Sequence, residues 1–420
     1  MAAEPRGRGR EMFRALGHRN YRLFWSGAFL SNAGTWMQTV AQAWLVFQLT
    51  DSALWLGVDT FVATAPGLLL TLPGGVIADK VDRKRLLIFT QLGCGLSAIT
   101  LAALVWAGAV RERHDIWMIL LLTLVTGTCW SISGPSYQAI TVDLVEREDL
   151  ANAIALNSTQ FQLARVVGPL LAGLTISLAG LAGCFLANGL SYVAIVVALS
   201  YVRIKKAGPS AEGGAVKAGR RSLWRDLLEG FSYVRGRPRV RVLLLASAVV
   251  SLFGMPYLVL APVFARDVYG WGETGLSLMM GTAGAGALCG ALLLAYLGDF
   301  GRKGLFVLAS AFSGGACIAA FSRAPGPASA MPLLFAVGFS MVSFFAAGNT
   351  LIQQLVTDEM RGRVMSMWLL TFIGTTPVGG FLSGSAAERY GPRATLTACG
   401  LIIALLVAFI ALRNPRLREI

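Results

Sequence analysis

The sequence has 420 residues, of which 55% are hydrophobic and only 14% are charged. A soluble domain carries about 25% charged residues, so this composition excludes a soluble enzyme, a secreted scaffold and a nucleic-acid-binding domain. A membrane-spanning helix needs about 20 consecutive apolar residues. The twelve hydrophobic segments that we find between residues 22 and 412 therefore predict an all-α membrane protein with twelve transmembrane helices.

The net charge of +14 is distributed unevenly along the chain. Of the 36 lysines and arginines, 29 lie in the two terminal segments and in the loops that follow the even-numbered hydrophobic segments. The positive-inside rule then predicts that both termini are cytoplasmic. The basic charge therefore reflects topology, and we expect no nucleic-acid partner.

The first hydrophobic segment carries polar residues at helical intervals. Asn32, Thr35, Thr39 and Gln42 are three or four positions apart, which places them on one face of a helix. Polar side chains within a membrane face protein or a water-filled cavity. This face is therefore interpreted as one wall of a central cavity, with helix packing as the alternative for any single residue.

Asp59 lies about two turns into the second segment, where an ionised carboxylate is costly. A desolvated carboxylate binds protons more readily than one in water, so Asp59 is a candidate for the group that takes up a coupling proton. The alternative is a structural acid near the membrane interface that pairs with an arginine or a backbone group. The sequence leaves both interpretations open.

The fifth segment contains a second polar stripe. Ser158, Gln162, Arg165 and Pro169 follow i, i+4, i+7 and i+11 spacing and so share one helix face. The fixed positive charge of Arg165 would attract an anionic or catechol-like substrate, or it would hold an acid such as Asp59 as its structural counter-ion. The sequence leaves this choice open as well.

Further polar residues within the predicted helices complete the set of cavity candidates. They are Gln138 in the fourth segment, Tyr257 in the seventh, Asn349 and Gln353 in the tenth, and Thr375 in the eleventh. For each of them alone, helix packing is the simpler explanation. As a set, they predict a central amphipathic cavity that binds a small-molecule substrate.

The strongest interruption of the hydrophobic pattern lies in the middle of the chain. Residues 207–221 are small, flexible and polar, and the next twelve residues have the apolar and charged faces of a short amphipathic helix. This pattern predicts an N-terminal six-helix bundle over residues 1–206, a cytoplasmic linker over residues 207–238, and a C-terminal six-helix bundle over residues 239–420.

The two predicted bundles are similar in sequence. An offset of 211 residues superposes Gly168 on Gly379 and Gly173 on Gly384. A repeat related through a central loop is found in many secondary transporters. Neither half contains the GxxxxGK[ST] loop that binds ATP phosphates, so we expect transport that does not consume ATP.

The loop after the second segment reads GVIADKVDRK from Gly75 to Lys84. It resembles the GxxxDRxGRR loop motif of the major facilitator superfamily, although Asp82 stands where that family usually has glycine. Other stretches resemble the branch that contains the enterobactin exporter and related bacterial drug exporters. These stretches are HRNYRLFW from residue 18, GTWMQTVAQAWLVFQLT from residue 34, LNSTQFQLARVVGPLLAG from residue 156 and RGRVMSM from residue 361.

The resemblance implies a role for the charged residues at the inner ends of the helices. Asp79 would cap the positive N-terminus of the eleventh helix, which begins near Arg361. Arg83 would pair with Asp143 at the end of the fourth helix. Together with Gly75, these residues would form a latch between the halves in the outward-open state. The alternative is that the basic residues of this loop only set the topology.

The resemblance also implies the major facilitator fold, in which two pseudo-symmetric six-helix bundles rock about a central site. We expect a proton-coupled exporter of a siderophore or drug in the bacterial inner membrane, with Asp59 or Asp143 as the proton-binding acid. The alternative is an importer or facilitator of a small metabolite on the same fold. A membrane enzyme is disfavoured, because no catalytic constellation of His, Cys and Ser is visible.

No cofactor or metal is expected. The six cysteines lie within hydrophobic segments without a CxxC pair, and the only two histidines, His18 and His114, lie in loops or at segment ends. A monomer in the lipid bilayer is the default expectation, with protons and a small molecule as the only other partners.

Overall fold

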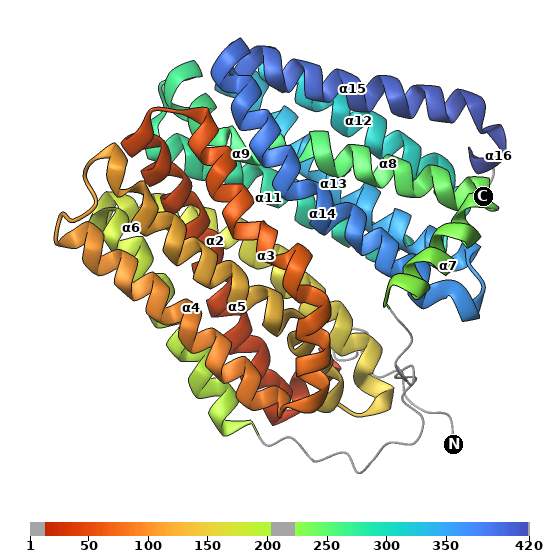
Figure 1. Ribbon diagram of the computed structural model, residues 1–420, viewed down its shortest axis with the longest axis horizontal. Coiled ribbons are helices and arrows are strands. Elements are labelled where there is room, and N and C mark those ends of the chain that lie inside the picture. Colours follow the sequence, from red (N-terminus) through yellow and green to blue (C-terminus); the bar gives the residue numbers. More distant parts are fainter. Residues whose placement is uncertain (1–12, 203–222, 419–420) are drawn as a thin grey trace, which may run out of the picture. The chain divides into compact units, whose positions relative to one another are not determined.

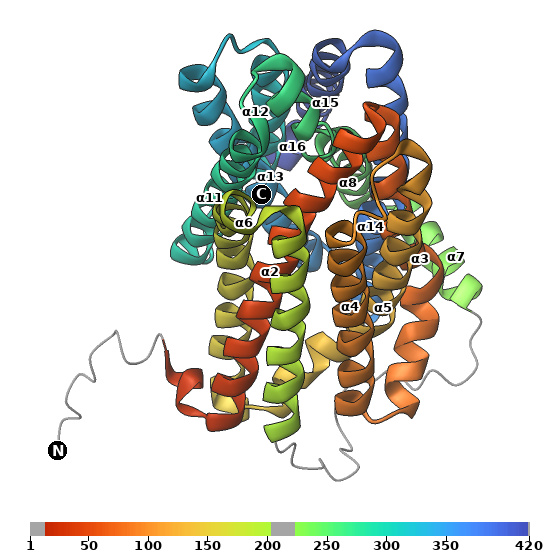
Figure 2. The same ribbon diagram turned by 90° about the vertical axis from the view of Figure 1, so that its left-hand side faces the viewer.

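The computed structural model describes residues 13–202 and 223–418, and every regular element in these two ranges is helical (Figures 1 and 2). The side chains of residues 71–80, 223–228 and 416 lie outside this description. Ten of the described helices are long and apolar enough to cross a membrane. The structure is therefore that of a multi-pass helical membrane protein.

Two helices separate this number from the twelve predicted segments. α6 (Leu150–Tyr201) has 52 residues and contains Gly180 at φ 68° and ψ −172°, a conformation that favours glycine. Figure 2 shows that α6 folds back on itself into two antiparallel arms, so it corresponds to two of the predicted segments. α2 (Arg19–Thr50) has 32 residues and is not among the ten. Its polar residues lower its hydropathy.

Residue contacts divide the chain into two compact units. The first contains residues up to Leu45 and Leu69–Pro209, and the second contains Val46–Leu68 and Ser210–Ile420. The end of α2 and the first part of α3 thus group with the C-terminal half. The predicted linker lies largely outside the described residues, but α7 (Leu223–Arg235) forms a helix where the amphipathic segment was expected.

The first unit is built from five long elements. They are α2, the second part of α3 (Ala53–Lys80), α4 (Arg83–Trp106), α5 (Ile116–Asp143) and α6, with the 3-10 turns η1 (Arg14–Gly17), η2 (Arg113–Asp115) and η3 (Arg147–Asp149). α4 begins after Asp82, whose carboxylate accepts a hydrogen bond from the backbone N–H of Arg85 at 3.1 Å. This is the N-cap that a helix start favours. α4 packs against α5 and α6.

α2 lies against the first arm of α6. The Tyr21 hydroxyl donates to the backbone carbonyl of Ala153 at 2.8 Å, and a β-carbon on Gly168 would lie only 2.6 Å from the carbonyl oxygen of Ala33. A side chain at position 168 would therefore push the two helices apart. This agrees with the close packing that the sequence predicts for Gly168 and Pro169.

The second unit contains the remaining elements. They are α7, α8 (Pro238–Gly254), α9 (Pro256–Val259), α10 (Ala261–Val263), the π-helical turn η4 (Phe264–Val268), α11 (Gly272–Leu297), α12 (Lys303–Arg323), α13 (Pro327–Leu355), α14 (Asp358–Tyr390), α15 (Pro392–Arg413) and α16 (Pro415–Arg418). α8, α12 and α15 lie side by side (Figure 1), and α11 packs on α13. Several of these helices begin with proline, which suits the first helical position because no N–H partner is needed there.

Candidate functional site: a polar pocket and the α3–α14 junction

A polar pocket of about 550 Å³ lies within the first unit, between α2, α4, α5 and α6. Its lining consists of amide and hydroxyl side chains together with Trp130, Tyr137 and Phe161, and it includes no charged residue. This volume is typical of sites for small organic molecules. The pocket is therefore suited to a ligand that offers uncharged hydrogen-bonding groups and an aromatic or apolar surface.

Several polar atoms of the lining are buried without a hydrogen-bond partner. They are Gln91 Oε1, Thr141 Oγ1, Asn157 Oδ1, both terminal atoms of Gln160, and Gln162 Oε1. A buried polar group that makes no hydrogen bond costs roughly 1–3 kcal/mol. A group of such atoms around one cavity is unusual for a purely structural core, and it is the arrangement that a polar ligand would complete.

Four of the sequence-predicted cavity residues line this pocket: Asn32, Gln138, Ser158 and Gln162. Asn32 also donates a hydrogen bond from Nδ2 to the Tyr137 hydroxyl at 3.3 Å. The structure thus brings the polar faces of the first and fifth predicted segments together with the end of the fourth.

The other members of these two stripes make contacts within the first unit. The Thr35 hydroxyl is 3.0 Å from the Tyr192 hydroxyl, Thr39 donates to the carbonyl of Thr35, and Gln42 Nε2 donates to Thr123 Oγ1 at 2.8 Å. Arg165 does not line the pocket, and its guanidinium lies 5.3 Å from the centre of the Trp36 ring. For these residues the structure shows packing contacts.

Sequence reasoning missed three residues of the pocket: Gln91, Asn157 and Gln160. Gln91 stands alone in its segment, so no spacing marks it. Asn157 and Gln160 lie within the LNSTQFQ stretch, where polar residues on several helix faces hide the single stripe. The signal that was present is the density of amides in that stretch rather than their period.

The candidates of the second unit do not gather in one described pocket. Asn349 and Gln353 are exposed and hydrogen-bond to each other at 2.6 Å, Thr375 donates to the carbonyl of Thr371, and Tyr257 is buried. A separate apolar cavity of about 440 Å³ lies between α8, α14 and α15. None of these candidates lines it.

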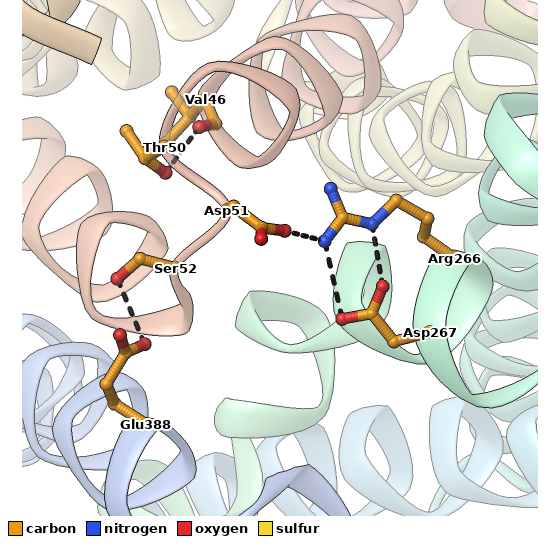
Figure 3. Close-up of polar contacts among 7 residues, drawn as sticks. All are labelled: Val46, Thr50, Asp51, Ser52, Arg266, Asp267 and Glu388. Atoms are coloured by element: carbon orange, nitrogen blue, oxygen red, sulfur yellow. Dashed lines mark hydrogen bonds and ion pairs between the residues drawn. The ribbon is translucent and has the colours of Figure 1, made fainter.

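A second polar constellation, the α3–α14 junction, joins residues 46–68 to the C-terminal half within the second unit. Arg266 in η4 forms ion pairs with Asp51 and Asp267, and its Nε lies 2.7 Å from Asp267 Oδ1 (Figure 3). The same guanidinium lies 3.9 Å from the centre of the Phe47 ring. A cation held by two carboxylates and an aromatic face ties the α2–α3 loop to η4.

Glu388 makes a second link in the same junction. Its carboxylate accepts hydrogen bonds from the Ser52 hydroxyl at 3.0 Å and from the backbone N–H of Leu54 at 3.4 Å (Figure 3). Leu54 lies in the first turn of α3. A carboxylate is favourable at this position because the N-terminal end of a helix carries a partial positive charge.

Glycines allow α3 and α14 to approach at backbone distance. A β-carbon at Gly57 would lie 2.5 Å from the carbonyl oxygen of Gly380, and one at Gly384 would lie 2.6 Å from that of Ala53. Neither backbone atom can move without shifting its helix. The junction therefore depends on Gly57 and Gly384 as well as on the charged residues.

The predicted latch is described only in part. Arg83 Nη1 lies 3.2 Å from Asp143 Oδ2, as the resemblance implied, and both residues belong to the first unit. Arg361 pairs with Asp358 of its own helix at 2.5 Å. The side chains of Gly75 and Asp79 lie outside the description. Whether these residues act as a latch stays a prediction.

Asp59, the other proton-binding candidate, is half-buried on α3, two residues after Gly57. It thus belongs to the part of α3 that packs with the C-terminal half. This position agrees with either interpretation, the proton-binding acid or the structural acid.

Comparison with known families decides the class of the protein. Residues 11–420 match the model of the transmembrane secretion effector family of the major facilitator superfamily. The chain belongs to this family. It is a membrane transporter of the exporter branch that the sequence resembles, and the match extends over both units.

Curated relatives of this transporter are exporters of siderophores or drugs. The staphyloferrin A transporter of Staphylococcus aureus is 24% identical, with 90% of this chain and 92% of the relative covered. The multidrug efflux pump Tap of Mycolicibacterium fortuitum is 27% identical over 94% and 95%. The enterobactin exporter EntS of Shigella flexneri is 26% identical over 96% and 94%.

The fold is shared with solved transporters. The crystal structure of the nucleoside transporter NupG superposes with a TM-score of 0.72, at 14% identity and with 95% of this chain and 99% of that chain covered. At this identity the likeness shows the fold alone.

Proposed function

We propose that the protein exports a medium-sized amphipathic organic compound, a siderophore or a drug, across the bacterial inner membrane in exchange for protons. Twelve helices, with α6 crossing twice, form two six-helix bundles that alternate access to a central site. Both termini are cytoplasmic. The exporting relatives and the basic termini and loops support this topology and direction.

The observation that carries the proposal is the polar pocket of the first unit. Its buried amide and hydroxyl groups without partners would be satisfied by the uncharged polar groups of a substrate, while Trp130 and Phe161 would contact its apolar or aromatic parts. Both siderophores and amphipathic drugs combine such groups. The pocket does not distinguish between these two substrate classes.

The α3–α14 junction supplies the device that alternating access needs. On the proposed topology the α2–α3 loop and η4 lie on the outer side of the membrane. The Arg266 and Glu388 contacts then close the outer side and must break when the substrate leaves. Asp59, on the same stretch of α3, is placed to couple this opening to proton binding.

Uptake into everted membrane vesicles tests the proposal, with a radiolabelled macrolide and enterobactin as the two probes. We expect accumulation of at least one probe when an inward-acid pH gradient is imposed, and loss of accumulation with a protonophore or in Gln160→Met. Equilibration that ignores the gradient would instead show a facilitator. Uptake in Gln160→Met at the wild-type rate would contradict the assignment of the pocket.

A further inference from the structure

A basic cavity of about 670 Å³ lies where α8 begins and where α13 and α15 end. Arg237, Arg239 and Arg413 line it, and its described lining contains no acidic residue. Arg237 and Arg239 flank Pro238, the first residue of α8, so the positive end of this helix points to the same place. The cavity is therefore a concentrated positive site.

The three arginines are available to bind an anion. Within the described part of the chain, no carboxylate pairs with any of them. Their recorded contacts are with aromatic rings only: the Arg237 guanidinium lies 5.2 Å from the Tyr233 ring centre and that of Arg413 lies 5.3 Å from the Phe409 ring centre. These stacked positions leave the guanidinium N–H groups unused.

The wall of the cavity is built rather than loose. Leu417 of α16 is 1% exposed, and its carbonyl oxygen packs against Gly304 of α12, where a β-carbon would not fit. Asn414 Nδ2 donates to the carbonyl of Ile410 at 3.0 Å, and Arg418 Nε donates to that of Ala411 at 2.6 Å. The last carbonyls of α15 are thus satisfied and do not offset the positive charge.

An apolar stripe leads from the cavity along α15. Leu405 and Phe409 precede Arg413 by eight and four residues, so the three share one helix face, and the two apolar side chains are 68% and 54% exposed. α15 is one of the apolar helices long enough to span the membrane. Exposed side chains on such a helix contact acyl chains of the bilayer.

We propose that this cavity binds the phosphate headgroup of an anionic phospholipid, with one acyl chain along Leu405 and Phe409. Arg237, Arg239 and Arg413 donate hydrogen bonds to the phosphate oxygens. Free phosphate has the same anionic chemistry, but the apolar stripe that continues from Arg413 gives it no advantage. The stripe therefore favours a lipid.

The test uses the full chain in detergent micelles, titrated with phosphatidylglycerol and read out by native mass spectrometry and thermal unfolding. Variants are Arg239→Gln with Arg413→Gln, and Arg241→Gln as the control, because Arg241 is exposed on the same helix but does not line the cavity. Each basic residue near an anionic lipid contributes about a factor of five to affinity, so we expect about a thirty-fold loss in the double variant. The control should bind as the wild type does.

The source of the phosphate is tested in the same system. Phosphatidylcholine and inorganic phosphate should each fail to displace phosphatidylglycerol, and dihexanoyl phosphatidylglycerol should bind more weakly than the dioleoyl lipid because it cannot follow the stripe. Equal affinity of the double variant and wild type would overturn the site. Displacement by inorganic phosphate at equal affinity would overturn the lipid as its occupant. Unfolding in phosphatidylcholine alone confirms that the variants are folded.

Discussion

The Ser52 hydroxyl donates a hydrogen bond of 3.0 Å to the carboxylate of Glu388, a residue 336 positions later in the chain. This contact places the start of α3 at the end of α14, next to the ion pairs of Arg266 (Figure 3). In the transport cycle that we propose, these contacts hold the outer side closed. They must therefore be weak enough to break in each cycle.

Arg266→Gln should favour the outward-open state. The Arg266 side chain is 32% exposed and that of Asp51 is 78% exposed, and exposed ion pairs contribute up to about 1 kcal/mol. We expect labelling of Thr60→Cys by an impermeant maleimide added from outside to rise about five-fold. Arg323→Gln, another arginine on the proposed outer side, is the control. An unchanged rate would show that Arg266 does not hold the junction.

Gly57→Ala and Gly384→Ala should disrupt the same junction by steric conflict with backbone atoms. Overpacking costs typically about 1–3 kcal/mol, so the closed form should lose about tenfold in population and vesicle uptake should fall accordingly. Gly374→Ala is the matched control, because its β-carbon would meet only Leu68 Cδ2 at 3.5 Å. Equal uptake by all three variants would rule out a backbone contact in the working transporter.

This junction shows what the sequence could and could not predict. The apolar segments, the Gly180 reversal and the helix 223–235 follow from hydropathy and turn residues, which are local properties. Arg266 was visible only as one of the few arginines outside the basic loops, and Asp51 only as a loop residue. Their pairing depends on the packing of α3 against the C-terminal half, which no local pattern encodes.

Gln160→Met should separate transport from stability. Both polar atoms of this buried amide are without partners, so an apolar side chain of similar volume should leave the free energy of unfolding unchanged or raise it by about 1 kcal/mol. Vesicle uptake should fall at least tenfold. Gln42→Met is the control: it breaks the 2.8 Å bond to Thr123 and should lower stability. A loss of stability in Gln160→Met would make the pocket a structural core.

The pocket was predicted in part for a physical reason. Asn32, Ser158 and Gln162 follow helical periods on otherwise apolar segments, and such stripes identify a cavity wall. The same reasoning selected Thr35 and Gln42, whose side chains are used in helix packing. Period alone reports that a face is polar. Only the neighbouring helix decides whether its groups are satisfied.

The ion pair of Arg83 and Asp143 offers a test of the inner latch. Their side chains are 40% and 22% exposed, so the pair adds little to stability. We expect Asp143→Asn to reduce uptake about five-fold at unchanged protein level, and the exchange Arg83→Asp with Asp143→Arg to restore most of it. Arg85→Gln, which removes a neighbouring charge, should have no effect. If the single variants match wild type, the loop serves topology only.

Proton exchange is the central claim, and substrate-driven proton flux measures it most directly. Wild type and Asp59→Asn are reconstituted in liposomes that contain a pH dye, and the macrolide or enterobactin is added on one side. We predict a substrate-dependent proton flux in wild type that disappears in Asp59→Asn. Flux that survives this substitution would assign coupling to another acid, with Asp143 tested next. Substrate movement by the wild type without any proton flux would contradict the account.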